Sequence, residues 1–112
     1  NNFYLTKLKL CTKFFSFFFL IPSTVTSIGI GSFQNCKSLT NVTIPPSLKD
    51  LEMYTFTDCS SISEVTIPST VSSIGSNAFS NCTSLTKVTF QEPSSVKTID
   101  DNAFCDCRSL KE

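Results

Sequence analysis

One arrangement of apolar and polar positions recurs four times along the chain. The copies begin at Ile21, Ile44, Ile67 and Phe90, 23 residues apart. Apolar residues fall in the same six positions of the first three copies and in the first five of these positions in the fourth, and polar residues fill most of the positions between them. The six columns are Val25, Leu48, Val71 and Val96; Ile28, Leu51, Ile74 and Ile99; Phe33, Phe56, Phe79 and Phe104; Cys36, Cys59, Cys82 and Cys107; Leu39, Ile62, Leu85 and Leu110; and Val42, Val65 and Val88. We therefore expect each position to have one environment, met once in every copy.

The period of the pattern predicts the architecture. Repeats of about 20–29 residues with apolar residues in fixed positions are typical of leucine-rich solenoids. In the stretch from Leu85 to Phe90, apolar residues alternate with Lys87 and Thr89, as in a half-buried strand. Stacked copies would align these strands in parallel, and the rest of each copy would supply the crossover. We predict a β-rich solenoid: a leucine-rich repeat coil with a parallel sheet on one face and short extended or 3₁₀ segments on the other.

Polar and small residues at fixed positions predict the turns. Asn or Asp precedes each column cysteine, and both residue types tolerate left-handed backbone; these are Asn35, Asp58, Asn81 and Asp106. A small or short residue precedes each phenylalanine: Ser32, Thr55, Ala78 and Ala103. A serine precedes each strand, and its hydroxyl is expected to satisfy a turn amide: Ser38, Ser61, Ser84 and Ser109. The segment Gln91–Ser95 has two extra residues and is predicted to bulge on the surface.

The first 20 residues do not match the full repeat. The predicted division is a Phe-rich N-terminal segment, 1–20, and an array of about four units, 21–43, 44–66, 67–89 and 90–112. Leu5–Leu10 copies the strand pattern of Leu85–Phe90, which indicates a degenerate repeat. Lysines followed by the run Phe14–Ile21 also resemble the start of a signal peptide, so both interpretations stay open. Repeat arrays need polar caps at their ends, and none is visible. We therefore expect a fragment of a longer array, with end-to-end self-association as the alternative.

Composition narrows the chemistry. Nine basic and nine acidic residues cancel, so the chain has no electrostatic footprint for nucleic acid. The apolar run at Phe14–Ile21 is too short to span a membrane. The chain has no histidine, which excludes imidazole-based catalytic triads and zinc sites with histidine ligands. It also has no phosphate-binding glycine loop and no calcium-binding loop. We predict no enzymatic activity, no catalytic residue, no metal and no cofactor.

Six cysteines in a short chain would suggest a disulfide framework. The repeat explains four of them better, because they occupy one apolar column and a free cysteine is buried well as a small hydrophobic residue. A column of reduced thiols is therefore expected. Cys11 and Cys105 lie outside the column and are the candidates for exposure.

The unit IPSTVSSIGSNAFSNCTSLTKVT at Ile67–Thr89 resembles the leucine-rich repeat of BspA-like surface proteins, which are known from bacteria and parasitic protists. The match covers Ile21–Glu112 and includes Ile-Pro, the Val/Ile pair, Ala-Phe, Asn-Cys and Ser-Leu at the family's spacings. The resemblance implies a non-catalytic protein-binding module, part of a longer cell-surface or secreted adhesion-type protein. Intracellular proteins also contain this repeat, so a structural scaffold without a specific ligand is the alternative. The family has no universal ligand residues to carry over.

The outward positions of the predicted strands form the candidate partner-binding face. Thr43, Thr66 and Thr89 make one column, and Asn41, Glu64 and Lys87 make the adjacent one. Solenoids bind other proteins with extended faces of this kind. Threonine is also a good strand former on a pleated surface, so a purely structural role for the column stays open. The expected partners are other proteins of unknown identity.

Overall fold

The computed structural model describes residues 3–5, 18–20 and 25–111, with the side chains of 25–111 except Asn41. The described residues form strands and turns and contain no helix. The strands are β1 (Phe3–Leu5), β2 (Phe18–Leu20), β3 (Val25–Ile28), β4 (Asn41–Thr43), β5 (Asp50–Leu51), β6 (Glu64–Ile67), β7 (Ser73–Ile74), β8 (Lys87–Phe90) and β9 (Thr98–Ile99).

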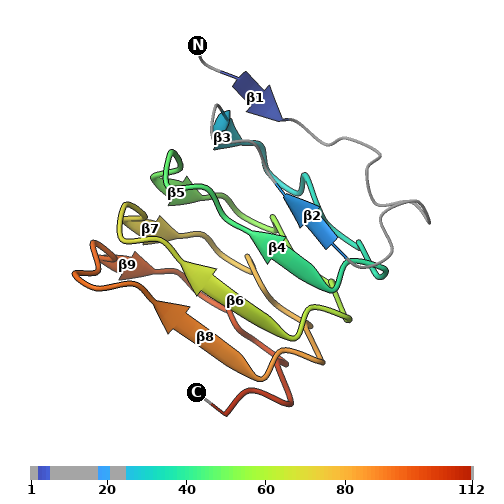
Figure 1. Cartoon of the computed structure of the whole chain (residues 1–112). Helices are drawn as coiled ribbons and strands as arrows, with labels where there is room; N and C mark the ends of the chain where they lie inside the picture. The colour runs from blue at the N-terminus through green and yellow to red at the C-terminus, as the bar shows by residue number, and fades with distance from the viewer. Residues whose placement is uncertain (1–2, 6–17, 21–24, 112) are drawn as a thin grey trace.

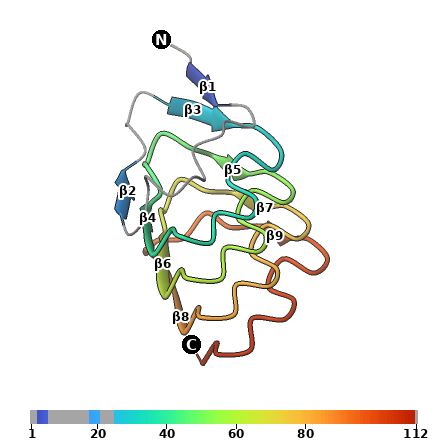
Figure 2. The same ribbon diagram turned by 90° about the vertical axis from the view of Figure 1, so that its right-hand side faces the viewer.

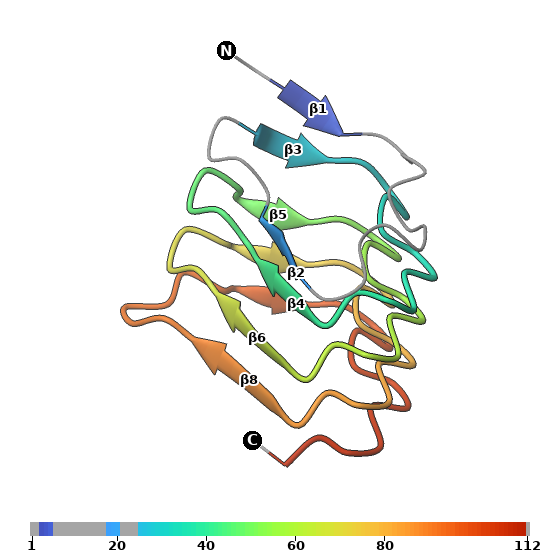
Figure 3. The same ribbon diagram turned by 45° about the vertical axis from the view of Figure 1, so that its right-hand side comes forward.

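These strands lie in two rows, and every pair is parallel. One row holds the pairs β2-β4 and β6-β8, and the other holds β1-β3 and the three-stranded set β5-β7-β9. Figures 1 and 3 show both rows, with β1 near one end and β8 and β9 at the other. The register of β6 with β8 runs from Glu64↔Lys87 to Ile67↔Phe90, which is an offset of one repeat. The predicted parallel strands and short extended segments are therefore confirmed.

The remaining side of each unit is a series of tight turns, which follow one another down the molecule in Figure 2. Backbone N–H groups of one unit donate to carbonyl oxygens of the next: Phe33 to Thr55 (3.0 Å), Phe56 to Ala78 (2.7 Å) and Phe79 to Ala103 (2.8 Å). These bonds link successive units at the depth of the aromatic column. The residue before each phenylalanine is buried, as its small size predicts.

The left-handed residues expected before the column cysteines are confirmed. Their φ angles are 69° at Asn35, 63° at Asp58, 63° at Asn81 and 60° at Asp106. A second left-handed column, four residues earlier, was not expected: Gly31, Tyr54, Asn77 and Asn102. Only three residues lie between the two left-handed positions of a unit, for example Ala78 to Ser80. This explains why the described part of the chain has turns where 3₁₀ segments were predicted.

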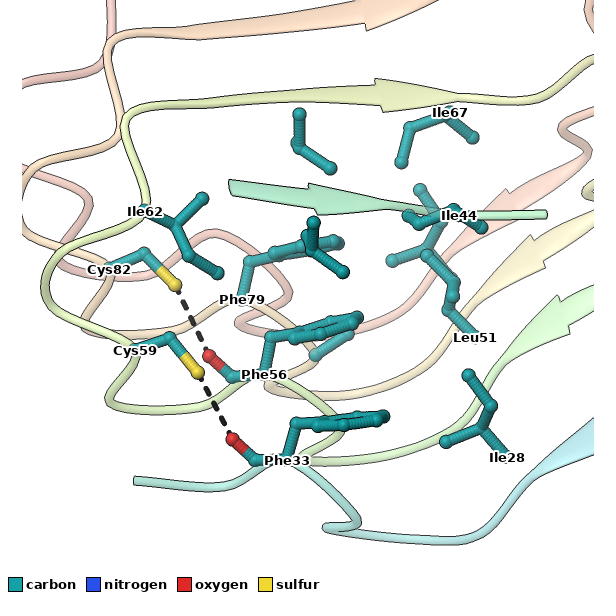
Figure 4. Close-up of a cluster of buried hydrophobic side chains, with 14 of the residues drawn as sticks. Ile28, Phe33, Ile44, Leu51, Phe56, Cys59, Ile62, Ile67, Phe79 and Cys82 are labelled. Carbon is teal, nitrogen blue, oxygen red and sulfur yellow. Dashed lines mark hydrogen bonds between the residues drawn. The ribbon is translucent and has the colours of Figure 1, made fainter. Parts of the chain in front are cut away.

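The apolar columns form one core, shown in Figure 4. Consecutive phenylalanine rings stack with centroids 5.4 Å apart for Phe33–Phe56 and 5.3 Å apart for both Phe56–Phe79 and Phe79–Phe104. The stacking of identical side chains predicted by the repeat is thus confirmed. The fourth unit is less covered: Phe104 is only partly buried, and Ile99 is 51% exposed where burial was expected. No described residue packs on the outer side of that unit.

The N-terminal alignment is wrong at Leu5. This residue lies in β1 and pairs with Ile28, on the row opposite to the repeat strands. The repeat-strand position is taken by β2 instead, where Phe18 pairs with Asn41, one repeat later. Leu5–Leu10 and the Phe-rich run both suit a buried strand, and apolar periodicity alone does not decide which of them pairs. Residues 6–17 lie outside the described part of the chain, and both the division at residue 20 and the signal-like interpretation stay predictions.

Candidate interaction surface

The candidate surface is the outward side of β4, β6 and β8. Successive side chains of a strand point to opposite faces, so β6 buries Val65 and Ile67 and exposes Glu64 and Thr66. The outward side chains described on the other two strands are exposed as well; these are Thr43, Lys87 and Thr89. The sixth candidate, Asn41, lies in β4, and its side chain lies outside what the structure describes.

The register places equivalent positions of successive repeats opposite each other across β6 and β8. Thr66 is opposite Thr89, and Glu64 is opposite Lys87. Within the described part of the chain, Glu64 and Lys87 form no ion pair with each other or with another residue. An exposed pair of this kind would contribute little to stability in any case. The carboxylate and the ammonium group are therefore both available to a ligand.

The strand ladders of both rows stop at one level, which we call the ladder break. Among the described strands, no ladder joins β3 to β5 or β4 to β6, although β4 lies beside β6 in Figure 1. The turn side continues across this level through the Phe33–Thr55 bond and a bond of 2.8 Å from the Asn35 N–H to the Thr57 carbonyl. The first two units are thus joined mainly by the turn side and the core.

Proline contributes to the ladder break. The Gln91 N–H donates to the Ile67 carbonyl at 3.0 Å, which closes the end of the β6-β8 ladder. Pro68 occupies the equivalent position one unit earlier and has no N–H to donate to Ile44. One hydrogen bond of the regular pattern is therefore impossible between β4 and β6.

A hollow of about 550 Å³ opens on the outward face at the ladder break. It is lined by Val42, Thr43, Ile44, Pro46, Glu64, Thr66, Pro68 and Gln91. The structure therefore brings together three of the six predicted site residues, Thr43, Glu64 and Thr66, whereas Lys87 and Thr89 lie outside the lining. The two prolines and Gln91 were not predicted as part of this face. The doublet Pro45-Pro46, where the third copy has Pro68-Ser69, was the available signal.

A smaller hollow of about 280 Å³ lies at the same level on the other row. Its lining includes Ser27 from the first unit and Asp50 from the second. The Ser47 hydroxyl crosses the level by donating to the Val25 carbonyl oxygen. The ladder break is therefore accompanied by open space on both rows of strands.

Two members of the cysteine column, Cys59 and Cys82, are buried free thiols of low reactivity. The thiol groups donate to phenylalanine carbonyl oxygens of the preceding unit: Cys59 to Phe33 (3.1 Å), Cys82 to Phe56 (3.2 Å) and Cys107 to Phe79 (3.1 Å). Figure 4 shows the first two bonds. Burial raises the pKa of Cys59 to about 12, and the neighbouring Cys107 thiol together with burial raises the pKa of Cys82. Since the thiolate is the reactive form, Cys59 and Cys82 are poor nucleophiles at neutral pH.

The expectation of a fully reduced column is wrong at Cys36, which is disulfide-bonded. The described cysteines Cys59, Cys82, Cys105 and Cys107 are free. Cys11, the other predicted candidate for exposure, lies outside the described residues. Disulfide connectivity does not follow from sequence spacing alone.

Cys105 is exposed, as predicted, and the negative charge of Asp106 raises the pKa of its thiol. The half-buried Cys107 donates inward to the Phe79 carbonyl oxygen, whereas Cys105 faces solvent. Residues 3–5, 18–20 and 25–111 contain no group of three or more side chains suited to hold a metal ion. Nor does this part of the chain include a helix of the length and hydropathy needed to cross a membrane.

Comparison with known proteins points to one family. The family model described as "BspA type Leucine rich repeat region (6 copies)" matches residues 7–112. A leucine-rich cell surface protein from Faecalibacterium prausnitzii has a similar structure, with 33% identity and a TM-score of 0.76 over 82% of this chain and 24% of that protein. No curated protein sequence is significantly similar to the chain.

Two other solved structures are similar. A leucine-rich repeat protein from Bacteroides ovatus is 29% identical, with a TM-score of 0.59 over 82% of this chain and 29% of that protein. The pneumococcal vaccine antigen PcpA is 27% identical, with a TM-score of 0.65 over 83% of this chain and 29% of that protein. The chain therefore spans only a quarter to a third of the length of these three structures.

Proposed function

Since the chain belongs to the BspA type leucine-rich repeat family, we propose that it is a non-catalytic protein-binding module of a longer, adhesion-type protein. In this proposal the stacked units continue as a solenoid in the parent protein. Its location is the cell surface or the secreted fraction. The similarity to a leucine-rich cell surface protein supports this location.

The observation that carries the proposal is the outward face of β4, β6 and β8. It combines exposed polar side chains on regular strands with a hollow at the ladder break, where Thr43, Glu64 and Thr66 meet. Repeat proteins use faces of this kind to bind extended surfaces of their partners. We propose that Asn41, Thr43, Glu64, Thr66, Lys87 and Thr89 belong to this face, with the hollow at its centre.

Interferometry tests the proposal by measuring whether the chain binds purified extracellular-matrix and plasma proteins, which are immobilised one at a time. We expect at least one of them to bind the chain. Replacing Glu64 and Thr66 together by arginine should weaken that binding at least tenfold, because two large cations would fill and recharge the hollow. The matched control replaces Thr98 and Asp101 by arginine, since both are exposed and lie outside the hollow. Equal binding by the Glu64/Thr66 variant would show that this face is not the site.

The structural alternative makes a different prediction for the same measurement. A spacer without a specific ligand would bind none of the immobilised proteins, and its threonine column would serve only as strand-forming surface. Labelling of intact source cells with an antibody against the chain tests the location. Absence of surface label together with cytoplasmic label would favour the intracellular scaffold.

Self-association through the end of the stack is a separate proposal. The fourth unit bears an apolar hollow of about 250 Å³, lined by Val88, Phe90, Ile99, Phe104 and Leu110. A second copy could cover this surface. Sedimentation velocity should then detect dimers that Ile99→Lys abolishes, and a monomer at all concentrations would reject the idea.

A further inference from the structure

We propose that the hollow between β4 and β6 binds an extended segment of the partner through a lysine or arginine side chain, with Glu64 as the counter-charge. This inference rests on the proposed function and specifies the chemistry of the partner. It arises from the charge of the hollow, its shape and its position at the ladder break.

The charge of the hollow favours a cation. Glu64 is the one charged residue among the lining residues described. Lys87, opposite Glu64 on β8, lies outside the lining and forms no ion pair with it. Thr43 and Thr66 place hydroxyl groups on the same lining, and Gln91 adds an amide. A hydrogen bond between a carboxylate and a lysine or arginine head is about twice as strong as one between neutral groups. The hydroxyl and amide oxygens can accept the remaining N–H groups of such a head.

The shape of the hollow suits a long aliphatic stem. Pro46 and Pro68 supply apolar rings, and Val42 and Ile44 complete the apolar part of the lining. Lysine and arginine bury their methylene stems against apolar surface while their charged heads stay in polar surroundings. The described lining includes no aromatic ring on which a sugar could stack. The hollow is therefore better matched to a basic side chain than to a glycan.

The ladder break favours an extended ligand. The facing edges of β4 and β6 are not joined by a strand ladder. Extended peptides gain affinity from main-chain hydrogen bonds to strand edges and gain specificity from pockets for single side chains. The hollow supplies one such pocket. β4 and β6 lie side by side, so no third strand enters between them, but main-chain groups left without ladder partners there can bond a segment that crosses the hollow.

Phage display tests the inference by selecting binders from a random library of seven-residue peptides. The target is the full chain, immobilised, and sequencing compares the selected peptides with the input library. We expect lysine and arginine to be enriched at one position of the selected peptides. Synthetic copies of these peptides should bind Glu64→Gln about tenfold more weakly than the wild type, and replacing their basic residue by norleucine should have the same effect.

The matched control is Asp101→Asn, which removes one exposed carboxylate outside the hollow and should leave peptide affinity unchanged. Thermal melting of all variants checks that they fold as the wild type does. Failure to select any peptide, selection without basic residues, or equal affinity for Glu64→Gln would each overturn the inference.

Glu64→Gln also separates this inference from the proposed function. The substitution removes the charge but keeps nearly the same shape, so a partner held by other contacts still binds. If the arginine pair at Glu64 and Thr66 blocks partner binding and Glu64→Gln does not, the face is the site but its ligand is not basic. If neither variant changes the binding of the partner, the proposed face fails as well.

Discussion

The thiol of Cys82 donates a hydrogen bond of 3.2 Å to the carbonyl oxygen of Phe56, in the preceding unit. The bond links the cysteine column to the aromatic column, and the same carbonyl oxygen also accepts the Cys59 N–H at 3.3 Å. A carbonyl oxygen has two lone pairs, so the thiol supplies the second donor. The column cysteines therefore act as donors between units as well as small apolar residues.

Stability should fall in alkaline solution because of these buried thiols. The folded-state pKa of Cys59 is raised from its ordinary value of 9.0 to about 12, so the unfolded chain ionises first. The stability that this thiol contributes is complete below about pH 9 and is lost as the pH rises from 9 towards 12. Urea unfolding at pH 7, 9 and 10.5 measures the decline. Cys59→Ala should be less stable at pH 7 and should decline less steeply; an equally steep decline would contradict the assignment.

Phe79→Ala should lower the free energy of unfolding by about 3–5 kcal/mol, because it opens a cavity in the middle of the aromatic column. The ring of Phe79 is fully buried and stacks on both Phe56 and Phe104. Phe104→Ala is the matched control, since this ring is partly buried and has one stacking neighbour among the described residues, and it should cost clearly less. Denaturant unfolding compares the two variants. Equal losses would argue against burial as the cause.

Tyr54→Asn should stabilise the protein. Tyr54 has φ +61°, whereas the equivalent residues of the other units are Gly31, Asn77 and Asn102. Left-handed backbone costs an ordinary residue about 1–2 kcal/mol, and asparagine tolerates it better. The tyrosine side chain is 40% exposed, so its removal loses only part of its packing. We expect a gain of up to about 1 kcal/mol by thermal or urea unfolding.

Removing an asparagine at the equivalent left-handed position of the next unit provides the control for Tyr54. Asn77 has φ +59° in the next unit, so Asn77→Ala should destabilise the chain by about 1 kcal/mol. A loss of stability in Tyr54→Asn would show that the tyrosine contacts outweigh the backbone strain.

Gly75→Ala should destabilise the protein through backbone crowding between units. A Cβ atom at Gly75 would lie 2.7 Å from the Met53 nitrogen and 2.9 Å from the Leu51 oxygen. Neither backbone atom can move away without disturbing the hydrogen bond of 2.7 Å from the Gly75 N–H to that same oxygen. Urea unfolding should show a loss well above that of Ser76→Ala, the neighbouring half-buried position. Equal stability of the two variants would mean that the units separate easily here.

Much of the fold can be derived from the order of residue types. The apolar columns identified the buried rings, and Asn81 and its equivalents marked the left-handed turns. The expected bonding of the serine column to turn amides was wrong at Ser61 and Ser109. The Ser61 hydroxyl donates to the Lys37 carbonyl at 2.6 Å, and the Ser109 hydroxyl donates to the Thr83 carbonyl at 2.8 Å. The expected partner was an amide of the local turn, whereas the observed partner belongs to the preceding unit.

For the candidate site, the sequence identified the outward face but not its centre. Alternation along the strands exposes Glu64 and Thr66, and this follows from the geometry of any strand. The hollow depends on the missing ladder between β4 and β6, which involves main-chain groups about one repeat apart. Residue types report such spacing only indirectly, here through Pro68, which lacks an N–H.

The sequence by itself determined the repeat period, the buried columns and the polar face, because each of these depends on whether a side chain prefers water or the core. Only the tertiary structure decided which N-terminal strand pairs with β4, where the ladders stop and that Cys36 is bonded covalently. These features depend on how backbones from different units approach one another. That approach is set by the packing of the whole stack, whereas the repeat pattern describes one unit at a time.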